Sequence, residues 1–258
     1  MAISKLTCGA VAALLGLSAA AYAAETPKPS MVEKVEQFQV RRTEELKAEY
    51  LLFLPKGYDA KAEKRWPLML FLHGSGERGT DPWKVAVHGP PKNVAQNPEF
   101  PFILVSPQCP AGQLWSDELL LGLLDDVTRR YAVDTNRVYL TGLSMGGYGT
   151  WSLGLKHPER FAAIVPICGG GEFVTILLAD SERAKALKTL GVWAFHGGKD
   201  PIVPVDESRR MVNALKNAGA TDVNITVYPD ASHDCWTEAY KDPGLYEWLL
   251  KHERKPGS

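Results

Sequence analysis

The chain of 258 residues has few cysteines and almost no net charge. It contains 4 cysteines, and its 29 lysine and arginine residues nearly balance 30 aspartate and glutamate residues, which gives a formal charge of −1. This balance argues against a polybasic surface, so no nucleic-acid partner is expected. A hydrophobic share of 45% with 23% charged residues excludes a disordered or fibrous protein. A chain this long buries roughly three quarters of its unfolded surface, so one large domain is expected.

The one long apolar run lies near the N-terminus. Residues 9–21 follow a single charge at Lys5 and end in Ala21-Tyr22-Ala23, a small-x-small pattern that signal peptidases cut. The run is too short to span a bilayer, and no stable membrane insertion is expected. We therefore predict a signal peptide over residues 1–23, a flexible lead-in over 24–34, and a single domain over 35–258. Export implies a secreted or periplasmic protein.

Three cysteines remain after this cleavage, at Cys109, Cys168 and Cys235. An oxidising compartment favours pairing two of them, and the sequence leaves the choice of pair open. The sequence has no CxxC motif and no histidine and cysteine cluster with the spacing of a zinc site. We therefore expect neither a metal nor another cofactor.

Short apolar runs alternate with helical patterns through the remaining sequence. The runs are 50–54, 68–72, 102–106, 138–141, 162–167, 192–195 and 224–228; helices are predicted over 118–131, 145–156, 206–218 and 236–251, with another near 176–190. This alternation predicts an α/β fold, with a mostly parallel sheet flanked by helices. Residues 74–101, rich in glycine and proline, are predicted to form a long loop over the carboxyl edge of the sheet.

A serine lies on a tight turn between the run 138–141 and the helix that follows it. The sequence is Gly142-Leu143-Ser144-Met145-Gly146. Such a strand-to-helix turn needs glycine two residues to each side, because a Cβ there would collide with neighbouring backbone. The helix N-terminus favours the negative charge that develops during acyl transfer. We predict that Ser144 is a nucleophile.

A serine hydroxyl needs a histidine base, and that base needs an orienting acid later in the chain. Asp200 and His233 each follow a predicted strand, so they are expected at the same sheet edge as Ser144. We predict Asp200 as the acid and His233 as the base. The competing acids are Asp206, Asp222, Asp230 and Asp234; the competing histidines are His88, His157, His196 and His252, of which His196 is expected to satisfy backbone groups at a strand end.

A tetrahedral intermediate also needs two amide donors for its oxyanion. The backbone NH of Met145 directly follows the nucleophile and is the first. The second is expected from the turn at residues 72–76, after another strand. We predict the backbone NH of Ser75, with Gly76 next to it.

With these residues in place, the sequence resembles α/β-hydrolases over nearly all of the chain that follows the signal peptide. The motifs that carry the resemblance are HGSGERG at 73–79, SPQCP at 106–110, GLSMGG at 142–147, PICGGG at 166–171 and HDCW at 233–236. They are similar to exported esterases of the phospholipase/carboxylesterase-like group, which is related to prolyl oligopeptidases, and to feruloyl and polyhydroxybutyrate-depolymerase-like esterases. The resemblance implies an α/β-hydrolase fold, and the spacing of the strands leaves no room for a propeller or a large lid.

The resemblance implies a serine carboxylic-ester hydrolase that works through an acyl-enzyme. An open site suits a small-molecule or oligomeric substrate with an exposed ester, of feruloyl, acetyl or polyester type. Trp115, Phe173 and Trp236 are candidates for lining a substrate pocket. Two alternatives are a serine peptidase on short peptides and a carbohydrate- or polymer-binding module that retains an inactive hydrolase fold. The sequence does not indicate an oligomeric state.

Overall fold

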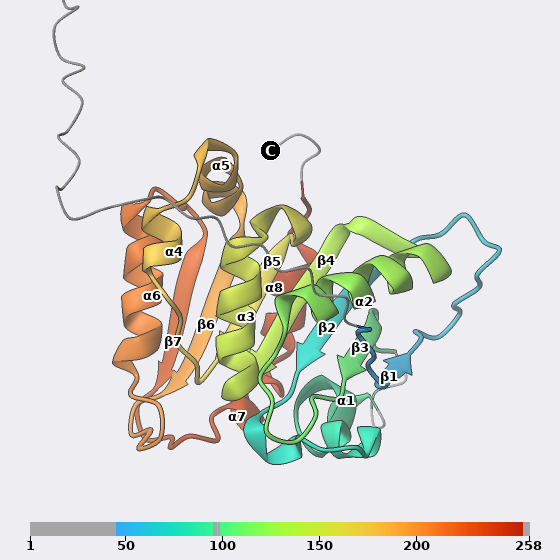
Figure 1. Cartoon of the computed structure of the whole chain (residues 1–258), viewed down its shortest axis with the longest axis horizontal. Helices are drawn as coiled ribbons and strands as arrows, with labels where there is room; N and C mark the ends of the chain where they lie inside the picture. The colour runs from blue at the N-terminus through green and yellow to red at the C-terminus, as the bar shows by residue number, and fades with distance from the viewer. Residues whose placement is uncertain (1–44, 95–96, 98, 255–258) are drawn as a thin grey trace, which may run out of the picture. The chain divides into compact units, whose positions relative to one another are not determined.

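The structure, a computed structural model, describes residues 45–94, 97 and 99–254 (Figure 1). The predicted signal peptide and lead-in lie outside these residues, as does the start of the predicted domain. Export therefore stays a prediction from the sequence, which N-terminal sequencing of the secreted protein would test. Within the described part of the chain, no helix combines the length and apolar character needed to cross a bilayer.

A seven-stranded sheet runs through the described residues, in the order β1-β3-β2-β4-β5-β6-β7. Its strands are β1 (Tyr50–Phe53), β2 (Trp66–Leu72), β3 (Ile103–Pro107), β4 (Val133–Leu143), β5 (Ala163–Ile167), β6 (Gly191–Gly197) and β7 (Val223–Tyr228). The edge strand β1 is antiparallel to β3, and the other neighbouring pairs are parallel. The predicted α/β fold with a mostly parallel sheet is confirmed.

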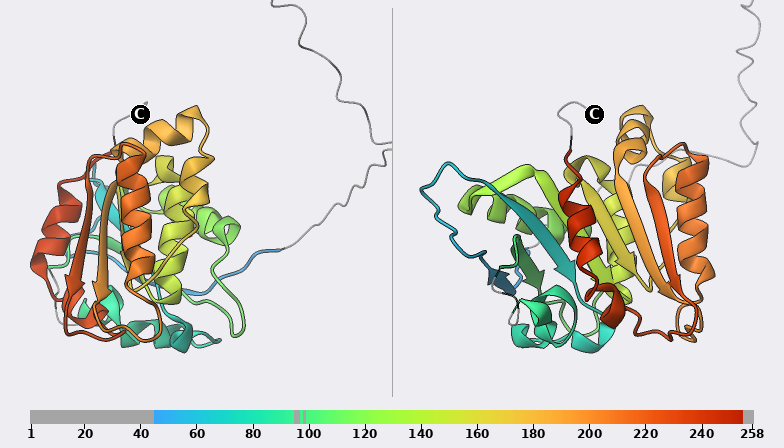
Figure 2. Two further views of the ribbon diagram at one scale, coloured as in Figure 1. Left: turned by 90° about the vertical axis from the view of Figure 1, so that its left-hand side faces the viewer. Right: turned by 180° about the vertical axis from the view of Figure 1, so that it is seen from behind.

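Helices cover both faces of this sheet. The helices are α1 (Gly89–Asn93), α2 (Asp117–Arg130), α3 (Met145–Lys156), α4 (Val174–Leu177), α5 (Ser181–Thr189), α6 (Asp206–Asn217), α7 (Trp236–Ala239) and α8 (Pro243–Leu250), with 3-10 turns at η1 (Ser75–Glu77), η2 (Pro82–Val87) and η3 (Pro158–Arg160). Figure 1 shows α2, α3 and α6 in front of the sheet, and the right-hand view of Figure 2 shows α8 on the opposite face.

Alternating side chains of the central strands build one core on each face. Leu68, Leu70 and Leu72 of β2 belong to the core that α2, α3 and α6 cover. Met69 and Phe71, which point the other way, belong to the core that α8 covers. All five residues of this strand segment are fully buried. A strand that is covered on both faces must be almost entirely apolar, and β2 has this composition.

Three local predictions differ from the structure. The helix predicted over 236–251 is two helices, because Pro243 begins α8 and Asp242 caps it by accepting a hydrogen bond from the Gly244 amide at 2.8 Å. The helix near 176–190 is likewise split into α4 and α5, where Asp180 caps α5 through the Arg183 amide. The predicted loop over 74–101 contains η1, η2 and α1.

Candidate active site

The turn between β4 and α3 carries Ser144 in a strained backbone conformation. Ser144 has φ +52° and ψ −116°, a region that residues with a side chain rarely adopt. A Cβ on Gly146 would lie 1.9 Å from the Leu72 carbonyl oxygen, and one on Gly142 would lie 2.5 Å from the Gly146 carbonyl oxygen. The turn is therefore closed against β2 so tightly that both positions require glycine.

The structure brings Ser144, Asp200 and His233 together at the carboxyl edge of the sheet. The Ser144 Oγ lies 2.9 Å from His233 Nε2, and His233 Nδ1 lies 2.7 Å from Asp200 Oδ2. A carboxylate accepts hydrogen bonds, so Nδ1 donates to Asp200 and the lone pair of Nε2 faces the serine hydroxyl. Among the competing acids and histidines, none lies between Ser144 and Asp200 in this chain of hydrogen bonds, and His196 contacts only its acidic end.

Asp200 is held ionised by its surroundings. Its Oδ1 accepts hydrogen bonds from the Ile202 and Val203 amides, each at 2.9 Å. Burial alone would raise the pKa of Asp200, but the hydrogen bond from His233 and those from the two amides outweigh it, and the pKa lies below its ordinary value. A carboxylate that keeps its charge fixes the tautomer and orientation of the imidazole beside it.

A second imidazole, on His196, contacts the same carboxylate. Its Nε2 lies 2.9 Å from the Val203 carbonyl oxygen and 3.3 Å from Asp200 Oδ2, and its Nδ1 lies 2.7 Å from Ser208 Oγ. Since Nε2 faces only acceptors, it carries the proton and donates to them. From the sequence we predicted the bond to backbone, but not the contact with Asp200, because that contact depends on how the loop after β6 turns back on itself.

Among the residues that the structure describes, one group of side chains is close enough together to hold a metal ion, and it belongs to this same network. The ligand atoms of Cys168, His196 and Asp200 lie within 4.8 Å of one another. Both ring nitrogens of His196 and both oxygens of Asp200 already have hydrogen-bonding partners in the chain. The Cys168 sulfur lies 2.9 Å from the sulfur of Cys235. We therefore assign these atoms to the hydrogen-bond network and to no metal.

The backbone amides of Met145 and Ser75 are the two predicted donors to an oxyanion. The Ser144 amide is occupied, since it donates to the Ile167 carbonyl at 2.9 Å. The first intrahelical bond of α3 runs from the Tyr148 amide to the Ser144 carbonyl, which leaves the Met145 amide without an acceptor inside the helix. Ser75, the other predicted donor, begins the 3-10 turn η1 after β2. Met145 and Ser75 line the same cavity.

His73 braces the turn that carries Ser75. Its Nδ1 donates to the Gly74 carbonyl at 2.7 Å, and its Nε2 accepts from the Cys109 amide at 3.0 Å. The Trp115 indole also donates to the His73 carbonyl at 3.3 Å. Two of these bonds come from the connection between β3 and α2, which ties the backbone before Ser75 to that connection.

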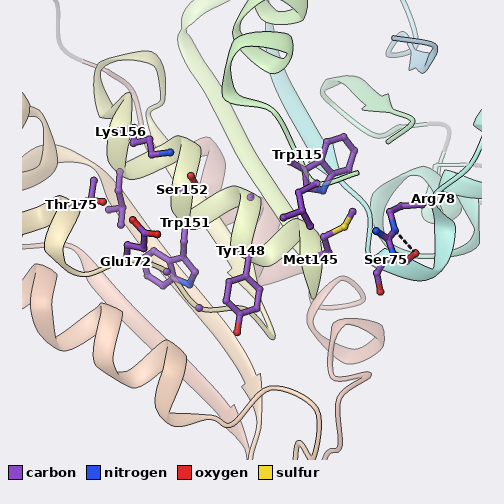
Figure 3. Close-up of a pocket in the computed structure, with 15 residues that line it drawn as sticks. Ser75, Arg78, Trp115, Met145, Tyr148, Trp151, Ser152, Lys156, Glu172 and Thr175 are labelled. Atoms are coloured by element: carbon purple, nitrogen blue, oxygen red, sulfur yellow. Dashed lines mark hydrogen bonds between the residues drawn. The ribbon is translucent and has the colours of Figure 1, made fainter. Parts of the chain in front are cut away.

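A cavity of about 570 Å³ extends from Met145 and Ser75, the predicted oxyanion donors, along α3 (Figure 3). Its apolar wall includes Trp115, Tyr148 and Trp151, and its more polar part includes Ser152, Lys156, Glu172 and Thr175. Figure 3 shows Met145 and Ser75 toward one end and Lys156 and Thr175 toward the other.

Of the three aromatic residues predicted to line a substrate pocket, only Trp115 lines this cavity. Phe173 stacks under Arg210 and is 39% exposed. Trp236 packs edge-on against His233, with ring centroids 5.2 Å apart, and contacts His88 in the same way. The sequence did not show which of these three aromatic residues lines the cavity and which two pack elsewhere near Ser144 and His233.

The two buried histidines near the site predict a dependence of stability on pH. Burial lowers the pKa of His73 and of His196 below the ordinary value, more than their hydrogen bonds raise it. The unfolded chain therefore binds protons first, and the free energy of unfolding should fall as pH drops below about 6.5. The loss should be at most about 1.4 kcal/mol per pH unit for each histidine.

Urea unfolding followed by tryptophan fluorescence between pH 7.5 and pH 5 measures this loss. Replacement of either histidine, as in His73→Asn or His196→Asn, should reduce the slope of unfolding free energy against pH. An unfolding free energy that stays constant over this range in the wild-type protein would contradict the prediction.

The sheet order, the serine on the turn after β4 and the acid and histidine after β6 and β7 define an α/β-hydrolase. Residues 116–243 match the Phospholipase/Carboxylesterase family, and the chain belongs to that family.

Curated relatives and solved structures agree with this assignment. The chain is 25% identical to Probable feruloyl esterase C of Aspergillus terreus over 185 residues, which are 69% of this chain and 64% of that protein. It is 29% identical to Acyl-protein thioesterase 1 of Mycosarcoma maydis over 43% of this chain and 47% of the relative. A thermostable esterase of known structure matches with a TM-score of 0.62 and 33% identity, over 80% of this chain and 59% of that one.

A ferulic acid esterase structure matches with a TM-score of 0.59 and 23% identity, over 78% of this chain and 89% of that one, which shows the shared fold. The chain spans less than two thirds of the length of the two curated relatives named above.

Proposed function

We propose that this chain is a serine carboxylic-ester hydrolase that works through an acyl-enzyme. The observation that carries the proposal is the continuous hydrogen-bond chain from Ser144 Oγ through His233 to Asp200, with contacts of 2.9 and 2.7 Å. A serine hydroxyl within reach of an imidazole that is oriented by an ionised acid has the arrangement needed for nucleophilic catalysis.

In this reaction His233 Nε2 takes the hydroxyl proton while Ser144 Oγ attacks the carbonyl carbon of the ester. The carbonyl oxygen becomes an oxyanion, which the Met145 and Ser75 amides stabilise. His233 then returns the proton to the oxygen of the departing alcohol, and an acyl-serine remains. A water molecule, deprotonated by the same imidazole, attacks the acyl-serine and releases the carboxylic acid.

The same geometry assigns the cavity along α3 to the acyl group. The departing oxygen must lie near His233 Nε2 to receive its proton, and the carbonyl oxygen must lie at the two amides. The third substituent of the carbonyl carbon therefore points away from His233. The cavity is lined by Met145 and Ser75 and by no residue of the loops that carry Asp200 and His233. The alcohol is left on the side of Trp236.

The size and lining of this cavity favour a bulky aromatic acyl group with polar substituents. A volume of about 570 Å³ is far larger than an acetyl group needs. Aromatic side chains form its wall, and Ser152 and Thr175 offer hydroxyls in its polar part. A hydroxylated cinnamoyl group satisfies both requirements. The relative from Aspergillus terreus, which is named a probable feruloyl esterase, supports the same substrate class.

A panel of p-nitrophenyl esters and the matching p-nitroanilides tests this proposal. We expect the purified protein to hydrolyse p-nitrophenyl ferulate with a higher kcat/KM than p-nitrophenyl acetate, and to cleave the matching p-nitroanilides more slowly than the esters. Faster cleavage of anilides would indicate the peptidase alternative, and a preference for acetate would contradict the aromatic acyl group.

Filling the cavity tests its role as the acyl site. Ser152→Phe, on α3, should lower kcat/KM for p-nitrophenyl ferulate by about 10- to 100-fold, because the acyl group loses its space. Hydrolysis of p-nitrophenyl acetate should stay within about twofold of wild type. Ser181→Phe, on the exposed face of α5, is the matched control and should change neither value. Equal losses on both substrates for Ser152→Phe would contradict the assignment.

A further inference from the structure

Two cysteine side chains meet beneath the loop that carries His233. The sulfur atoms of Cys168 and Cys235 lie 2.9 Å apart, although the residues are 67 positions apart in the sequence. Both residues are buried, at 0% and 1% exposure. Cys168 follows β5 directly, and Cys235 lies two residues after His233 and precedes α7.

We infer that Cys168 and Cys235 form a disulfide that fastens the loop of His233 to the end of β5. The fold already holds both backbones at this approach. The Cys168 amide donates to the Phe195 carbonyl at 2.9 Å, and the Cys235 carbonyl accepts from the Ala239 amide at 3.1 Å. The sulfur of Cys109 instead faces the carbonyl oxygens of Pro110 and Gln113, at 3.8 and 3.6 Å. This geometry resolves the pairing that the sequence left open.

The bond forms by thiol–disulfide exchange with a small disulfide such as oxidised glutathione. One cysteine thiolate attacks the reagent and displaces one thiol, and the second cysteine thiolate then attacks the mixed disulfide and displaces the other. The two cysteines lose two protons and two electrons, and the reagent leaves as two thiols.

Burial sets when this exchange takes place. A reagent cannot reach either sulfur in the folded chain, and the contact with Cys168 together with burial raises the pKa of Cys235, so little thiolate is present there. The exchange therefore belongs to folding, before the core closes around the two sulfurs.

The consequence is a covalent limit on the mobility of the catalytic base. His233 is joined to Asp200 and Ser144 by hydrogen bonds, and Cys235 lies two residues further along its loop. A bond at Cys235 ties this loop to the strand end beside the nucleophile turn, where the Ser144 amide is bound to the last residue of β5. Closing a loop of this length is also expected to stabilise the fold.

Refolding of the full chain tests the inference directly. The wild-type protein is unfolded in denaturant with reductant, refolded in oxidised and reduced glutathione, unfolded again without reductant in iodoacetamide, and digested for mass spectrometry. We expect one linked peptide that joins Cys168 to Cys235, with Cys109 alkylated, and with Cys8 alkylated where the sample retains it. Alkylation of Cys168 and Cys235 in this oxidised sample, or a link from either of them to Cys109, would overturn the inference.

A thermal measurement distinguishes the bond from simple packing of the two thiols. Refolding in reductant, instead of in oxidised and reduced glutathione, should lower the Tm of the wild type and of the Cys109→Ala control by about 5–15 °C. It should have no effect on the Cys168→Ala/Cys235→Ala double variant, which has lost the same packing. An equal Tm for oxidised and reduced wild-type protein would contradict a stabilising disulfide. Neither measurement depends on ester hydrolysis, so the inference stands or fails apart from the proposed function.

Discussion

Replacement of Ser144 by alanine is expected to lower kcat for p-nitrophenyl esters by about 10⁴- to 10⁶-fold. The variant loses the oxygen that attacks the ester, and the residual rate comes from the oxyanion amides and from substrate binding. The fold should be retained, because the Ser144 side chain bonds only to His233 and its amide still reaches the Ile167 carbonyl. The measurement is steady-state hydrolysis together with circular dichroism.

A matched control separates this loss from a general effect of handling or substitution. Ser181→Ala, at the exposed start of α5, should keep wild-type turnover. A fluorophosphonate should also modify Ser144 in the wild-type protein and leave the Ser144→Ala variant unlabelled. Wild-type turnover in a folded Ser144→Ala variant would remove the basis of the proposed function, and an unlabelled wild-type protein would favour the binding-module alternative.

Asp200→Asn is expected to lower kcat by about 10⁴-fold while binding of the ester changes little. The carboxamide can present its NH2 group to His233 Nδ1. The imidazole then carries its proton on Nε2, and Nε2 has no lone pair to accept the proton of the serine hydroxyl. The loop keeps its main bonds, since the Asn oxygen can accept from the Ile202 and Val203 amides as the carboxylate does, and His196 Nε2 keeps the Val203 carbonyl as its acceptor. The measurement is kcat and KM for the same ester in both proteins.

Asp206→Asn provides the comparison for this variant. Asp206 begins α6, is paired with Arg209 on the same helix at 3.0 Å, and was the nearest competing acid in the sequence. Its loss should leave kcat within about twofold of wild type, as expected for an exposed ion pair. A large loss in Asp206→Asn with little change in Asp200→Asn would show that the acid has been assigned to the wrong residue.

The regular parts of this fold were predictable because each has a local cause. Helix α3 has the bounds that were predicted, residues 145–156, since the glycine turn fixes its start and His157-Pro158 fixes its end. The meeting of Ser144, Asp200 and His233 followed from topology, because all three follow parallel strands that end at one edge. The splits before α5 and α8 were missed because a hydrophobic helical pattern continues through a capping aspartate.

The contacts that involve several segments were beyond the sequence. The approach of His196 to Asp200 depends on how the loop after β6 turns back on itself, and the meeting of Cys168 with Cys235 depends on two loops at once. Which aromatic residues face the cavity is set by the path of the chain before α2 and after β5. A sequence pattern shows which face of a single helix or strand is apolar. It does not predict these contacts, because none of them lies within a single helix or strand.

Helix α3 connects Ser144 to the cavity that we propose for the acyl group. Its first residue follows Ser144, and Tyr148, Ser152 and Lys156 line the cavity at intervals of four residues, about one helical turn or 6 Å apart. These three positions therefore lie at increasing distance from Ser144 along the cavity. A large side chain introduced at one of these three positions would limit the length of the acyl group that the cavity accepts. The loops that carry Asp200 and His233 would not be changed.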